Sequence, residues 1–202
     1  ATATLTLEHP LLDVINTSSV TSNVDMVSVS GTLTMSSNAP LIKVSDNASL
    51  YSTANLVTVN AGGHLQLSGP LLQQSGTSFA NIQNILFDVE NGATVTSTGT
   101  APFIQVGGIS PQLDSPAAVM VSAIAPGTTV TLAGPLLSVT GGASVNFAYL
   151  LDIQNDAAFT VGGPLLTMPS GTPAVTIGSD VMSLASTNAV TGPTDGTPLI
   201  NV

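Results

Sequence analysis

The stretch PLLSVTGGASVNF, residues 135–147, decides the fold of this chain. Apolar residues alternate with polar ones on both sides of a turn at Gly141-Gly142. Alternation with a period of two indicates β-strands, because successive side chains of a strand point to opposite sides. Each run is too short to form a stable sheet with its neighbours in sequence. Such strands need partners from distant parts of the chain.

The stretch begins with a proline followed by two bulky apolar residues, and this phrase occurs seven times along the 202 residues. The successive steps are 30, 30, 32, 33, 29 and 34 residues. Self-similarity at such a period indicates a protein built from stacked repeats. The seven phrases begin at Pro10, Pro40, Pro70, Pro102, Pro135, Pro164 and Pro198.

A second set of similar apolar anchors lies between the proline phrases, and merging the two sets shortens the repeat to about 15 residues. When each short strand pairs in parallel with its counterpart one coil away, the rest of the coil is the crossover that parallel pairing requires. The pattern therefore predicts an all-β fold, a parallel β-helix (β-solenoid) with coils of about 15 residues, or alternatively about 30. We expect one domain over residues 1–202. The second anchors are Val27, Val57, Phe87, Val119, Leu151 and Met182.

Other folds explain the pattern less well. An antiparallel β-sandwich also has many short strands, but it does not account for one phrase that returns seven times. The segments 79–85 and 115–125 would each suit a helical turn. We expect them to be loops that leave the coil, or strained coils.

The composition excludes several classes of function. Lys43 is the only basic residue, against eleven acidic residues and a formal net charge of -10. Nucleic-acid binding needs basic groups that meet phosphates, so that class is excluded. Cysteine is absent, which removes disulfides and thiol chemistry. No apolar run approaches the roughly 20 residues of a membrane-spanning helix.

A polysaccharide-cleaving enzyme is the natural catalytic hypothesis for a β-helix, because acidic residues there act as acid and base or bind Ca²⁺. Asp13, Asp88 and Asp152 each follow an apolar pair and are expected near one column. Lys43 is the one cation that could stabilise a developing enolate. We favour the competing interpretation that these carboxylates are solvated outward residues. The sequence therefore predicts no enzyme, and no catalytic, cofactor-binding or metal-binding residues.

Other metal ligands are few. His9 and His64 each lie beside a turn, and two histidines without a ligand motif do not predict a zinc site. Turns with neighbouring acid and asparagine residues do not predict a calcium site either, because Ca²⁺ takes six to eight oxygen ligands. Those turns contain Asp46-Asn47, Glu90-Asn91 and Asn155-Asp156.

Threonine recurs in Thr-x-Thr strings, and a flat face of such strings along a solenoid is the arrangement of some ice-binding proteins. The strings miss too many coils to predict a continuous plane, and Thr is in any case a good outward residue on a strand. They are Thr2-Ala3-Thr4, Thr32-Leu33-Thr34, Thr94-Val95-Thr96 and Thr129-Val130-Thr131.

Three phrases carry a resemblance to a known class: LLSVTGGASV (136–145), LFDVENGATV (86–95) and LVTVNAGGHL (56–65). They resemble the coil repeats of bacterial β-helical surface and secreted proteins, such as autotransporter passengers and filamentous-haemagglutinin-like adhesins. The resemblance implies export, a secreted or cell-surface location, and a structural or adhesive task. It transfers no catalytic residue, because a fold does not imply a function.

We therefore expect a structural segment of an extracellular or cell-surface fibre or adhesin. The strand pattern reaches both ends, Thr2 to Leu7 and Asn201-Val202, without a polar cap, which favours end-to-end stacking as part of a longer rod or filament. The expected partners are a second copy and a cell-surface or glycan partner, with no nucleic acid and no membrane span. The alternative is a carbohydrate-binding or carbohydrate-cleaving β-helix, for which exposed aromatics are scarce, and the third is an ice-binding solenoid.

Overall fold

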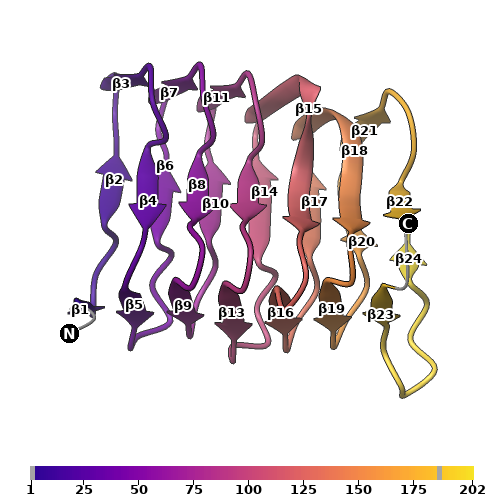
Figure 1. Cartoon of the computed structure of the whole chain (residues 1–202). Helices are drawn as coiled ribbons and strands as arrows, with labels where there is room; N and C mark the ends of the chain where they lie inside the picture. Colours follow the sequence, from indigo (N-terminus) through magenta and orange to yellow (C-terminus); the bar gives the residue numbers. More distant parts are fainter. Residues whose placement is uncertain (1–2, 186–187) are drawn as a thin grey trace.

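The chain winds into a rod of stacked coils, here in a computed structural model that describes residues 3–185 and 188–202, with side chains described for all of these except 116–120. Within that part of the chain the regular elements are strands, and every pairing between coils is parallel. The first four strands pair in order with the next four, so each coil has four strand positions. Figure 1 shows the coils stacked along the rod, with the first and last strands at its opposite ends. The predicted parallel β-helix is therefore confirmed.

We name the four sides of the rod faces A to D, in the order in which the chain visits them. Face A, along the bottom of Figure 1, stacks β1 (Thr4–Leu7), β5 (Thr32–Met35), β9 (His64–Leu67), β13 (Thr94–Ser97), β16 (Thr129–Leu132), β19 (Ala158–Val161) and β23 (Ala189–Thr191). Face B, at the back, stacks β2 (Leu12–Val14), β6 (Ile42–Val44), β10 (Leu72–Ser75), β14 (Ile104–Gly108), β17 (Leu137–Gly141), β20 (Leu166–Thr167) and β24 (Ile200–Asn201).

Faces C and D are joined by two long bent strands, β15 (Gln112–Ile124) and β18 (Ser144–Gln154). Face C, along the top of Figure 1, stacks β3 (Ser19–Ser22), β7 (Ser49–Ser52), β11 (Phe79–Ile82), the first parts of β15 and β18, and β21 (Ala174–Ile177). Face D, at the front, stacks β4 (Val27–Val29), β8 (Val57–Val59), β12 (Phe87–Val89), the second parts of β15 and β18, and β22 (Met182–Ala185).

One coil takes about 30 residues, so the preferred coil of about 15 is wrong and the alternative is confirmed. Leu12 pairs with Ile42 and Val27 with Val57. The proline phrases lead into face B, whereas the second anchors, except Val119, lie on face D, across the core. The two sets look alike because both send apolar side chains into one core from opposite sides. A period in the sequence shows how often a residue meets the same environment. Each coil has an inward-facing position on face B and another on face D, so the sequence period is half the length of the coil.

The core is a set of apolar columns that run the length of the rod. On face A the inward column Leu33, Leu65, Val95, Val130 and Phe159 is buried. Faces B and D meet directly where the rings of Phe87 and Phe103 pack edge to face, with centroids 5.1 Å apart. Because the inward side chains of one coil lie on those of the next, each coil needs its neighbours to bury its core.

The two segments expected to leave the coil are strands. Residues 79–82 form the regular strand β11 of face C, so the loop prediction for 79–85 is wrong there. Residues 115–124 belong to β15, whose pairing with β18 shifts register between Ser115 and Val119. Extra residues in this coil are absorbed as an irregularity, and Val121, not the predicted anchor Val119, pairs with Phe87.

The corners need residues that tolerate a left-handed backbone. Gly141, between faces B and C, has φ +68°, and a Cβ there would lie 2.2 Å from the carbonyl oxygen of Gly108. Only glycine fits where two corners stack so closely. At corners with more room the same conformation is taken by Asn and Asp, including Asp46, Asn47 and Asn155.

Candidate functional site

The outward side of face A carries two parallel columns that consist mainly of threonine. Register places one residue of each coil directly over its counterpart in the next, so both columns run from the first coil to the last. The first column is Thr4, Thr32, His64, Thr94, Thr129, Ala158 and Ala189, and the second is Thr6, Thr34, Gln66, Thr96, Thr131, Thr160 and Thr191. We call these fourteen positions the threonine face.

The threonine face is more continuous than the sequence predicted. Threonine fills ten of its fourteen positions, and His64-Leu65-Gln66 is the one described row without it. Full Thr-x-Thr rows occur on four of the seven strands, β1, β5, β13 and β16, and β19 and β23 add one threonine each. The string Thr2-Ala3-Thr4 contributes Thr4 only, because Thr2 is outside the described residues and the first row is Thr4 with Thr6. Thr6, Thr160 and Thr191 were missed because coil lengths vary and hide the register.

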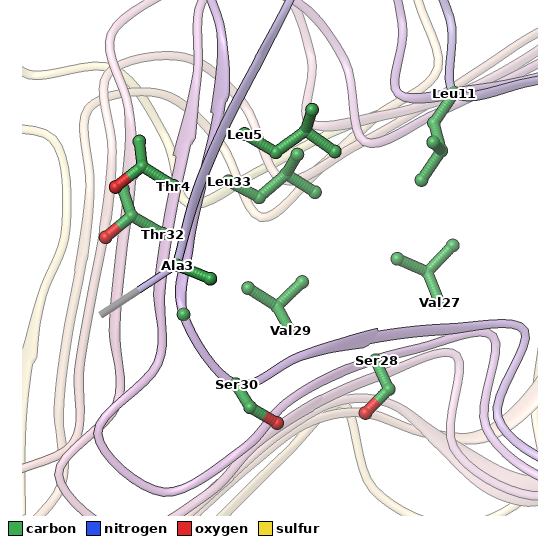
Figure 2. A pocket seen from close by; sticks show the side chains of 11 residues that line it. Ala3, Thr4, Leu5, Leu11, Val27, Ser28, Val29, Ser30, Thr32 and Leu33 are labelled. Carbon is green, nitrogen blue, oxygen red and sulfur yellow. The ribbon is translucent and has the colours of Figure 1, made fainter. Parts of the chain in front are cut away.

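The side chains of this face point away from the core. Figure 2 shows Thr4 and Thr32 one above the other, while Leu5 and Leu33 from the same two strands point inward. Thr4, Thr6, Thr129 and Thr131 are exposed, and the threonines of β5 and β13 are partly exposed. Stacked strands lie about 4.8 Å apart and alternate residues along a strand about 6.7 Å apart, which sets the mesh of the array.

The threonine face carries no carboxylate and no lysine. All eleven acidic residues and Lys43 lie outside the seven strands of face A, although the chain has a formal net charge of -10. His64 is the one ionisable side chain on it. It is the first residue of β9, directly after the turn that contains Gly62, and its side chain is exposed. Charge is thus kept off one side of the rod.

The acidic residues predicted to share a column are divided between two faces. Asp88 and Asp152 do share one column on face D, with Ser122 between them. Asp13 lies on face B, where it pairs in register with Lys43 and its Oδ1 forms an ion pair with the Lys43 Nζ at 3.7 Å. The expectation of one column is therefore wrong for Asp13. The two carboxylates on face D are two coils apart, and the lysine lies on another side of the rod.

Asp88 lies in a polar ladder that connects successive coils of face D. The Asn55 Nδ2 donates to Thr58 Oγ1 at 3.0 Å and to Asp88 Oδ2 at 3.4 Å. The Asn55 Oδ1 in turn accepts from the backbone N–H of Ile85 at 3.1 Å. Burial raises the pKa of Asp88, and Glu90 and Asp25 add to the rise, while the Ser122 hydroxyl opposes it. The contacts of Asn55 with Asp88 and with Ile85 join two successive coils.

The remaining candidate ligands stay apart. His9 is exposed just before Pro10, in the first coil, whereas His64 belongs to the third. Among residues 3–185 and 188–202, no group of three or more His, Asp or Glu is placed to hold a metal ion. Asp46 and Asn47 have φ angles of 56° and 66°. Asp and Asn tolerate this left-handed conformation, which accounts for their place in a turn.

Most of the phenylalanine side chains are buried in the core. Four of the five phenylalanines, Phe87, Phe103, Phe147 and Phe159, are buried. Phe79 and Tyr51 lie on face C, where Phe79 is 36% exposed and the Tyr51 hydroxyl accepts a hydrogen bond from Gln83. In the described chain no helix is long and apolar enough to span a bilayer.

No protein-family model matches the chain, and no curated protein or solved structure matches it either. The fold defines the class as a parallel β-solenoid. Its function is inferred from the residues exposed on its four faces and at its two ends.

Proposed function

We propose that this chain is a rigid structural rod of a secreted or cell-surface fibre, extended when copies stack head to tail. The observation that carries the proposal is that both ends of the rod expose residues of the apolar core, whereas the core of the coils between them is buried. The resemblance of its coil phrases to bacterial β-helical surface proteins supports the extracellular location.

The N-terminal end is an open section of the core. Figure 2 shows Leu5, Leu11, Val27, Val29 and Leu33 around a cavity of about 230 Å³. Leu5 is 49% exposed and Leu11 42%, whereas Leu41, the counterpart of Leu11 one coil later, is fully buried. The leucines differ only in whether another coil lies over them, so a further coil is what this surface fits.

The C-terminal end is the complementary section of the same core. Leu184, Leu199 and Ile200 are 50%, 36% and 42% exposed. Leu184 and Ile200 belong to β22 and β24, which pair on one side only, with β18 and β20, so their other edge is a ready template for pairing. Contact between two unlike ends repeats by translation and does not close, so it produces filaments in preference to dimers.

Sedimentation velocity over a concentration series, with negative-stain electron microscopy, tests the stacking. We expect elongated oligomers of wild-type protein that vanish in the double variant Leu5→Glu and Leu11→Glu, because unpaired charges at the contact are costly to bury. Ile109→Glu is the matched control, since Ile109 is 80% exposed on the side of the rod. Single particles at high concentration, or equal loss in the control, would contradict the proposal.

A further inference from the structure

We propose that the threonine face binds the ordered water lattice of an ice crystal. This proposal is independent of head-to-tail stacking, because it concerns a side of the rod and not its ends. Three properties of face A support it: its two-dimensional repeat, its free hydroxyl groups and its lack of charge.

The repeat makes the face complementary to a periodic ligand. Register aligns ten threonines in two columns over seven strands, with a mesh of about 4.8 by 6.7 Å. Each threonine presents a methyl group and a hydroxyl group. Because a β-branched side chain has few χ1 states, little side-chain freedom is lost when the array meets a surface. A single small molecule would cover only a fraction of such an array, whereas a crystal face extends over the whole of it.

The hydroxyl groups of the ten threonines are left available. In the described residues none of them makes a hydrogen bond with another protein group, whereas the corner residues Thr98 and Thr128 donate theirs to backbone carbonyls. Outward amides on the other faces are engaged between coils. Gln73 donates to Gln105 on face B at 3.0 Å, and Asn146 donates to Asp114 on face C at 2.9 Å. Face A keeps both columns of threonine hydroxyls for solvent.

The lack of charge and of aromatic rings narrows the ligand class. A carboxylate or ammonium group orients its own hydration shell, which conflicts with a fixed water lattice, and face A has neither. Crystalline polysaccharide is the other periodic surface that a flat face can meet. Binding to sugar rings relies on exposed aromatic platforms, and the outward positions of face A hold Thr, Ala, His and Gln only.

The test measures the fraction of the full chain that enters slowly grown ice, together with thermal hysteresis. Wild type is expected to concentrate in the ice and to show hysteresis, and the double variant Thr96→Tyr and Thr131→Tyr is expected to lose both. Thr176→Tyr is the matched control, because Thr176 is an exposed outward threonine on face C. Circular dichroism checks that all variants are folded.

Three results would overturn the proposal. Wild type that stays in the liquid fraction, as an excluded solute does, would show that the face does not recognise ice. Equal loss in Thr176→Tyr would assign the effect to something other than face A. Sedimentation with insoluble chitin or cellulose, without enrichment in ice, would identify a polysaccharide ligand instead. Intact stacking of the face A variants keeps this test separate from the test of head-to-tail contact.

Discussion

Face A and face D contain strands of similar length, pair with the same parallel register and line the same core, yet they use their outward positions in opposite ways. At face D, Asn55 donates to Asp88 of the next coil, and the outward residues Thr58, Ser122 and Asp152 are buried. Face A carries threonines whose hydroxyl groups bond to no other protein group among the described residues. At face D a side-chain hydrogen bond joins two coils, whereas on face A the threonine hydroxyls face solvent.

Removal of one amide should expose this difference most clearly. Asn55→Ala deletes bonds to Thr58, Asp88 and the backbone of Ile85 while Asn55 is only 8% exposed. We expect a loss of about 1–3 kcal/mol in the free energy of unfolding, because buried partners are left unsatisfied. Urea unfolding followed by circular dichroism measures it.

Thr96→Ala on face A is the control for that measurement, and its effect should stay within about 0.5 kcal/mol. Equal losses in the two variants would show that the faces do not differ in their structural use of polar groups.

A smaller effect should follow from neutralising the face D carboxylate. The pKa of Asp88 is raised by burial, so folding binds its proton more tightly, and the stability from this group is lost as pH rises through the folded-state pKa. Asp88→Asn should therefore stabilise the protein at neutral pH, by roughly 0.5 kcal/mol because the carboxylate is partly solvated. The gain should disappear in acid.

The matched variant is Asp13→Asn on face B, which removes the ion pair with Lys43. Thermal melts of both variants at neutral and acidic pH test whether the two substitutions change the stability in opposite directions. Asp13→Asn should destabilise slightly at neutral pH, as expected of an exposed ion pair. A neutral-pH loss in Asp88→Asn would refute the burial argument.

The smallest change in stability, and the sharpest test of the threonine face, comes from filling its gap. The double variant His64→Thr and Gln66→Thr should leave the free energy of unfolding within about 0.5 kcal/mol, because both positions are exposed. Thermal hysteresis should rise, since the array becomes continuous from β1 to β16. A fall in hysteresis would mean that His64 or Gln66 contributes to binding and does not interrupt it.

Much of the fold could be predicted from local pattern. The alternation within 135–147 and the turn at Gly141-Gly142 predicted short strands, and the sevenfold proline phrase predicted their stacking. The prediction was wrong where it needed to know which anchors share a column. Val57 and Ile42 look alike in sequence because both point inward, yet they lie on faces D and B. Similar environments on opposite sides of one core cannot be told apart by residue type.

The outward residues were harder to predict than the core. Asp13 and Asp88 follow equivalent phrases, but one belongs to face B and the other to face D. The threonine strings were visible, whereas their continuity was not, because pairing along face A joins residues 28 to 35 positions apart.

The sequence by itself determined the strands, the turns, the inward columns of Leu, Val, Ile and Phe, and the scarcity of positive charge. These are local properties, set by side-chain alternation and by backbone preference at the corners. Only the tertiary structure decided the coil length, the four faces and the threonine face, because those depend on which strands of different coils lie side by side. Insertions such as the register shift in β15 are accommodated within the coil, so register is restored by core packing that no local pattern reveals.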